Sequence, residues 1–134
     1  MAAQKGFSIV EILVVLIIIS VSLAVFIPSV TNAQFNSRIR AVQNNMRAIG
    51  AADQRYFEDN NNVYYTSATG NDFILINQNL RLSLTDMGNG FQYSCANTGT
   101  CTAISATFPS APGTTISIDA TGNLTCASVL PCPN

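Results

Sequence analysis

The chain is apolar at almost every position between residues 7 and 30. From Phe7 to Ile27 the only polar residues are Ser8, Glu11, Ser20 and Ser22. A run of this length predicts a helix that can cross a bilayer, which takes about 20 residues. Glu11 is the exception, because an unpaired carboxylate in hydrocarbon is costly. We therefore expect Glu11 either to be neutral near the bilayer edge or to meet a cation.

Beyond residue 30 the apolar residues recur with a helical period and predict an amphipathic helix. The apolar stripe consists of Ile39, Val42, Met46, Ile49 and Tyr56. The residues expected off this stripe are Arg38, Arg40, Arg47, Asp53 and Arg55. Polar residues at 58–62 end the pattern. One helix is therefore predicted from about Phe7 to about Glu58, with a kink at Pro28, because proline removes a backbone hydrogen bond.

Residues 60–90 are predicted to be a connecting region. Turn-forming residues are concentrated at 60–62, 66–72 and 86–90. The apolar residues between these turns, at 73–76 and at Leu80, Leu82 and Leu84, fit either short strands or a helical turn. The sequence leaves both readings open.

Residues 91–134 show the alternation that is typical of an antiparallel sheet with one apolar face. In the first expected strand, residues 91–95, one face holds Phe91, Tyr93 and Cys95. In the second, residues 101–108, the residues in phase are Ile104, Ala106 and Phe108. Two further strands are expected around Ile116 and Ile118 and around Leu124 and Cys126. We expect the apolar face of this sheet to cover the helical stripe.

Composition narrows the function classes. Charged residues make up 10% of the chain and the net charge is −1, so nothing suggests an electrostatic nucleic-acid binder. The chain has no histidine, which excludes Ser-His and Cys-His nucleophile pairs, and it has no phosphate-binding glycine motif. We expect no enzyme, no cofactor and no metal. Asp86 and Asp119 are the only calcium candidates, and no acidic cluster surrounds them.

The four cysteines predict a disulfide-bonded domain. An even number of cysteines behind a membrane-inserting segment is typical of an exported protein. Three pairings are possible. The two local pairs, Cys95–Cys101 and Cys126–Cys132, are favoured because each brackets a short linker. A zinc site is the competing reading, but the spacings are wide and no histidine contributes.

The residues Gly6-Phe7-Ser8-Ile9-Val10-Glu11 resemble the processing site of type IV prepilins and of the pseudopilins of type II secretion. The resemblance implies that a prepilin peptidase cuts between Gly6 and Phe7 and that Phe7 is then N-methylated. It also makes Glu11 the glutamate at the fifth mature position and Pro28 the helix-kinking proline. A secretory signal peptide is the alternative, but its apolar core is shorter and ends at small residues.

The resemblance implies an α+β protein with the type IV pilin fold. Its long N-terminal helix, with the apolar half protruding, packs on a sheet of three to four antiparallel strands. The expected divisions are a leader at 1–6, a membrane or filament-core helix at 7–30, an amphipathic helix at 31–59, a connecting region at 60–90 and the sheet at 91–134.

Three functions follow from these expectations. The first is a structural subunit of a type IV pilus, serving adhesion, twitching motility or DNA uptake. The second is a pseudopilin of a secretion machine, and the third is a membrane-anchored binding protein that does not polymerise, which Glu11 argues against. The implied partners are copies of the chain, other pilins, the prepilin peptidase and an inner-membrane assembly platform. Contact with nucleic acid is left open. The implied location is the inner membrane and then an extracellular pilus or periplasmic pseudopilus.

Overall fold

A computed structural model of the chain describes residues 8–67, 70–85, 90–106 and 112–133, without the side chains of 25–29 and 31. The chain divides into two compact units, Met1–Gln34 and Phe35–Asn134. The second of these is called the C-terminal unit below.

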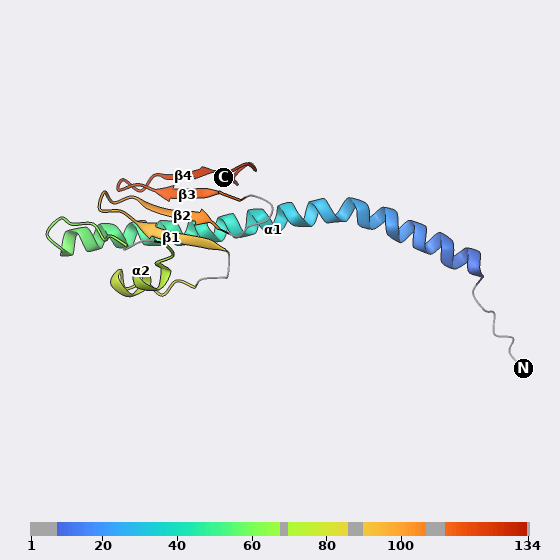
Figure 1. The fold of residues 1–134 in the computed structure, drawn as a ribbon, viewed down its shortest axis with the longest axis horizontal. Coiled ribbons are helices and arrows are strands. Elements are labelled where there is room, and N and C mark those ends of the chain that lie inside the picture. The colour runs from blue at the N-terminus through green and yellow to red at the C-terminus, as the bar shows by residue number, and fades with distance from the viewer. Residues whose placement is uncertain (1–7, 68–69, 86–89, 107–111, 134) are drawn as a thin grey trace, which may run out of the picture. The chain divides into compact units, whose positions relative to one another are not determined.

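The fold is α+β, as the sequence predicts, with one long helix and a four-stranded antiparallel sheet (Figure 1). The helices are α1 (Ile9–Asp59) and α2 (Phe73–Asn79). The strands are β1 (Phe91–Cys95), β2 (Cys101–Ser105), β3 (Thr115–Ile118) and β4 (Leu124–Ala127). Each strand pairs with the next along the chain, in the order β1-β2-β3-β4. This architecture is consistent with the type IV pilin fold.

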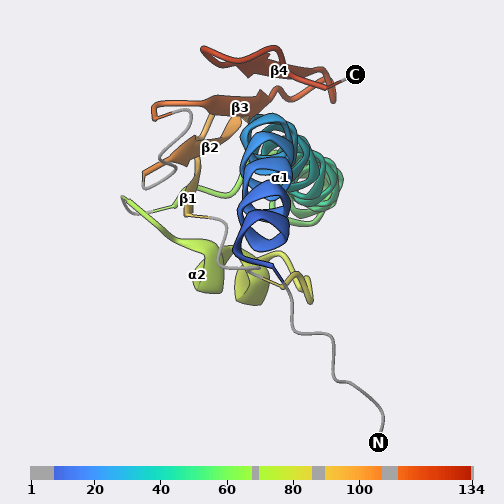
Figure 2. The same cartoon turned by 90° about the vertical axis from the view of Figure 1, so that its right-hand side faces the viewer.

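The core of the C-terminal unit lies between the sheet and the second half of α1 (Figures 1 and 2). The predicted stripe is confirmed, since Ile39, Val42, Met46 and Ile49 are each at most 1% exposed. On the sheet side the buried residues include Phe91, Tyr93, Ala103, Ile116 and Ile118. A helix whose apolar residues recur every three or four positions can bury one face in this way and leave its arginines in solvent.

The second strand presents the opposite face from the one predicted. Cys101, Ala103 and Ser105 are buried, whereas Ile104 is 44% exposed. Of the other predicted residues, Ala106 is exposed and Phe108 lies outside the described residues. The reason is the register, because β2 pairs Ala103 with Tyr93 and Cys101 with Cys95. The small side chain of Ala103 leaves room for the Tyr93 ring, and a shift of one residue would reverse every side chain.

The connecting region contains a helix, α2, so the strand reading of residues 73–76 is wrong. Phe73 and Ile76 are buried one turn apart, and Leu80 is buried just after the helix ends. The segment before α2 runs along the free edge of β1. There the Ser67 N–H donates to the Cys95 carbonyl at 3.0 Å, and the Asp72 N–H donates to the Tyr93 carbonyl at 3.0 Å. These bonds satisfy backbone groups that an edge strand would otherwise expose.

Candidate assembly site

The N-terminus of α1 places Glu11 in a defined helical position. The Ser8 carbonyl accepts hydrogen bonds from the N–H groups of Glu11 at 3.0 Å and Ile12 at 3.2 Å. Ser8 is therefore the N-cap residue, and Glu11 is the third residue of the helix. Ser at the N-cap with Glu three residues later is the capping-box pattern. The spacing of Ser8 and Glu11 carries this signal in the sequence, although the resemblance to the prepilin processing site does not depend on it.

The electrostatics of this helix end favour a carboxylate. The first turn leaves backbone N–H groups without intrahelical partners, so the helix end carries partial positive charge. Glu11 is the acidic residue in that turn, and its side chain is exposed. It is also the only charged residue between positions 8 and 37. The carboxylate can therefore satisfy the helix end locally and still remain accessible to a cation from outside the helix.

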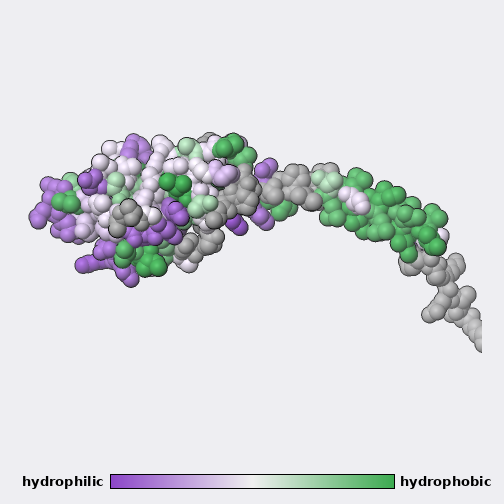
Figure 3. All heavy atoms as spheres, in the orientation of Figure 1, coloured by the Kyte–Doolittle hydropathy of each residue, from purple (hydrophilic) through white to green (hydrophobic). Residues whose placement is uncertain are grey.

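The apolar residues that follow Glu11 are uncovered. The large apolar residues between Ile9 and Leu23 are 48–78% exposed, whereas Val42, Met46 and Ile49 further along α1 are completely buried. Figure 3 shows these exposed apolar side chains gathered along the first part of α1. Exposed apolar surface of this extent marks a site of interaction with protein or lipid.

Two serines interrupt this apolar run without leaving their hydroxyl groups unsatisfied. Ser20 Oγ donates to the Leu16 carbonyl at 2.7 Å, and Ser22 Oγ donates to the Ile18 carbonyl at 2.8 Å. Both bonds reach back one helical turn. The two hydroxyl groups therefore do not need water as a hydrogen-bond acceptor, which suits an apolar environment.

A membrane span over residues 7–30 was expected from the sequence. Within the part of the chain that the structure describes, no helix is both long enough and apolar enough to cross a membrane.

Three predicted site residues, Gly6, Phe7 and Pro28, lie in whole or in their side chains outside the part of the chain that the structure describes. Gly6 and Phe7 lie outside the described residues, as does the predicted cleavage between them. Pro28 lies within α1, but its side chain is not described, so the kink stays a prediction. Of the predicted assembly residues, only Glu11 is therefore placed with its side chain.

The structure contains the two local disulfides that the spacing favours, Cys95–Cys101 and Cys126–Cys132. The first joins residues that are paired across β1 and β2, so it closes the hairpin at its turn. The second ties the end of β4 to the C-terminal segment. That segment also contacts α1, where Gln43 Nε2 donates to the Pro133 carbonyl at 3.3 Å. Both bridges thus hold surface loops to the sheet.

Asp53 was predicted to lie off the apolar stripe, and this was wrong. Its side chain is 1% exposed, and its Oδ1 accepts a hydrogen bond from the Tyr65 N–H at 2.9 Å. Its Oδ2 lies 3.9 Å from the bridged Cys101 Sγ. Burial raises the pKa of the Asp53 carboxyl, and the hydrogen bond from Tyr65 partly opposes that rise. The carboxylate anchors the chain as it returns from α1.

Asp119, one of the two calcium candidates, organises a turn instead. Its Oδ1 accepts hydrogen bonds from the Thr121 hydroxyl at 2.6 Å, the Thr121 N–H at 2.9 Å and the Asn123 N–H at 2.9 Å. These bonds, that of the Thr121 hydroxyl above all, lower the pKa of Asp119. Asp86 lies outside the described residues. Among those described, no three acidic, histidine or cysteine residues gather to hold a metal.

Comparison with known proteins bears on the N-terminal segment alone. Residues 1–27 match the family described as the prokaryotic N-terminal methylation motif. The chain therefore carries the signature of type IV pilins and pseudopilins, a family of structural subunits. No curated protein and no solved structure matches the chain significantly.

Proposed function

We propose that the chain is a structural subunit of a type IV pilus, assembled through the first part of α1. The observation that supports this most strongly is the run from Ile9 to Leu23, whose large apolar side chains are all about half exposed or more. Covering one such side chain fully contributes about 1.5–3 kcal/mol. Many copies packed side by side would cover the whole run. Lipid of the inner membrane covers it before assembly.

Glu11 sets the axial position of each copy in this proposal. Cleavage after Gly6 creates a positively charged amine on Phe7, four residues before Glu11. Inside a bundle of apolar helices an unpaired Glu11 is costly, and a paired one is much less so. A stagger that brings Glu11 to the Phe7 amine of a neighbouring copy is therefore preferred over other staggers.

The variant Glu11→Gln tests this role, because it keeps the shape of the side chain and removes its charge. We expect the protein to be exported, cleaved and folded, while filaments recovered by shearing fall at least tenfold. Glu58→Gln is the matched control, since Glu58 is exposed near the other end of α1. It should leave filaments at wild-type abundance. Wild-type amounts of filament from cells producing only the Glu11→Gln chain would reject the proposal.

Processing of the N-terminus is the second expectation. The prepilin peptidase and an inner-membrane assembly platform are the partners that the motif implies. Mass spectrometry of assembled protein should show N-methylated Phe7 as its first residue. Assembled protein that still begins at Met1 would contradict this. Filaments found only in the periplasm, and never in the sheared fraction, would favour a pseudopilin over a pilus subunit.

A further inference from the structure

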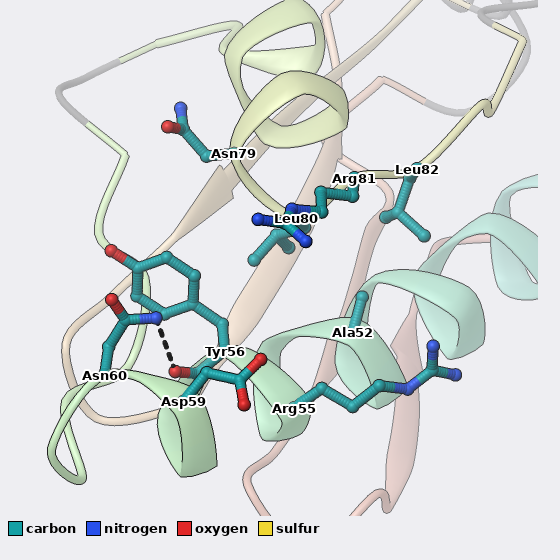
Figure 4. A pocket seen from close by; sticks show the side chains of 9 residues that line it. All are labelled: Ala52, Arg55, Tyr56, Asp59, Asn60, Asn79, Leu80, Arg81 and Leu82. Atoms are coloured by element: carbon teal, nitrogen blue, oxygen red, sulfur yellow. Dashed lines mark hydrogen bonds between the residues drawn. The ribbon is translucent and has the colours of Figure 1, made fainter.

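A polar cleft lies in the C-terminal unit and shares no residue with the candidate assembly site. Its volume is about 690 Å³, which is within the usual range of about 300–1,000 Å³ for small-molecule sites. Figure 4 shows that its walls come from two elements. Arg55, Tyr56 and Asp59 belong to the last turns of α1, whereas Asn79 and Arg81 belong to the end of α2 and the residues after it.

Arg81 occupies a backbone position that normally belongs to glycine. Its φ is 52°, in the left-handed region. The Leu82 N–H donates to the Asn77 carbonyl at 2.8 Å, and the Arg81 N–H donates to the Gln78 carbonyl at 3.4 Å. These two bonds define a Schellman motif, whose left-handed residue is most often glycine. A strained arginine at this place suggests that the side chain is needed for something other than ending the helix.

The charged side chains that line the cleft carry a net positive charge, because two are arginines and one is an aspartate. Arg55 and Arg81 oppose a single carboxylate, Asp59, and no ion pair or side-chain hydrogen bond joins either arginine to another described residue. The ends of α1 and α2 add carbonyl groups with partial negative charge. A dianion would be repelled by these groups and by Asp59. A monoanion that also has hydroxyl groups could bind an arginine through its charge and donate hydrogen bonds to Asp59.

The remaining lining fits the same ligand. The amide oxygens of Asn60 and Asn79 can accept hydrogen bonds from sugar hydroxyls, while their Nδ2 groups donate to the Tyr56 and Leu75 carbonyls. Leu80 and Leu82 offer apolar contacts that suit the C–H face of a sugar ring. The arginine fork matches a carboxylate in two parallel hydrogen bonds. We propose that this cleft binds a sugar that carries a carboxylate, such as a uronic acid. None of the cleft's residues lies in the first unit, so the cleft shares no residue with the apolar run.

The variant Arg81→Gly provides a sharp test, because glycine suits the backbone conformation at this position and removes the cation. The full chain in non-ionic detergent would be titrated with glucuronic acid by ligand-observed NMR, with glucose as the neutral probe. We expect wild type to bind glucuronic acid at least tenfold more tightly than glucose, and added salt to weaken that binding. Arg81→Gly should lose at least tenfold in affinity, with no fall in its unfolding temperature.

Arg40→Gln is the control for general charge, because Arg40 is exposed on α1 outside the cleft. It should bind glucuronic acid as wild type does. The proposal is overturned if wild type does not prefer glucuronic acid to glucose or if inorganic phosphate binds as tightly. Equal affinity in Arg81→Gly and wild type, or an equal loss in Arg40→Gln, would also overturn it.

Discussion

Two variants of the buried Asp53 separate the effect of its hydrogen bond from the effect of its charge on stability. Asp53→Ala removes the acceptor of the Tyr65 N–H, which lies 2.9 Å from Oδ1 in the native structure. A buried donor left without a partner costs about 1–3 kcal/mol. For a folded unit of about 100 residues, each kcal/mol lowers the unfolding temperature by about 4–8 °C. Asp53→Ala should therefore unfold at least about 4 °C below wild type.

Asp53→Asn keeps an oxygen for Tyr65 and removes the charge, so it isolates the effect of pH. The pKa of Asp53 is raised in the folded protein above its ordinary value of 3.8. Its contribution to stability is therefore complete below pH 3.8 and is lost as the pH rises through the folded pKa. Wild type should lose stability relative to Asp53→Asn across that interval.

Thermal unfolding followed by circular dichroism measures both effects, on the full oxidised chain in non-ionic detergent between pH 3 and pH 8. The difference between wild type and Asp53→Asn is the useful quantity, because other titrating groups are common to both proteins. If wild type gained stability over Asp53→Asn as the pH rose, the hydrogen bond from Tyr65 would outweigh burial. The reasoning about Asp53 would then be wrong.

Two further predictions concern packing and the surface loops. A Cβ added at Gly50 would lie 2.7 Å from Ile118 Cδ1. We expect Gly50→Ala to destabilise the protein, because overpacking of about 1–3 kcal/mol outweighs a gain in helix propensity of about 1 kcal/mol. Replacing Ile118 with valine in the same chain should offset part of this loss. If urea titrations showed that the losses of the two single variants simply add, this explanation would be contradicted. Replacing Cys126 and Cys132 with serine should cost about 2–3 kcal/mol. Removing the buried bridge between β1 and β2 should cost more, because both bridges span the same sequence separation of 6 and differ in burial. Equal losses in the two variants would show that loop closure, not burial, decides.

The features that the sequence predicts well are those with a local period. Each of these features depends on residues that are neighbours on one helix or strand. They are the N-terminal motif, the apolar run, the stripe from Ile39 to Ile49 and the alternation in β1. The same holds for the two short disulfide loops, because the linkers between the cysteines are brief. The burial of the stripe, the alternating burial in β1 and the pairing of the four cysteines in the structure follow the pattern of the sequence.

Three features were decided by tertiary packing. The face of β2 depends on its register with β1, which brings Ala103 opposite Tyr93, and alternation within β2 cannot reveal that pairing. Asp53 is buried because the chain returns past α1 and offers the N–H of Tyr65, a residue far enough along the chain to lie outside any helical period. The fold of α2 depends on Phe73 and Ile76 finding a shared core, since seven residues are too few for a stable helix by themselves.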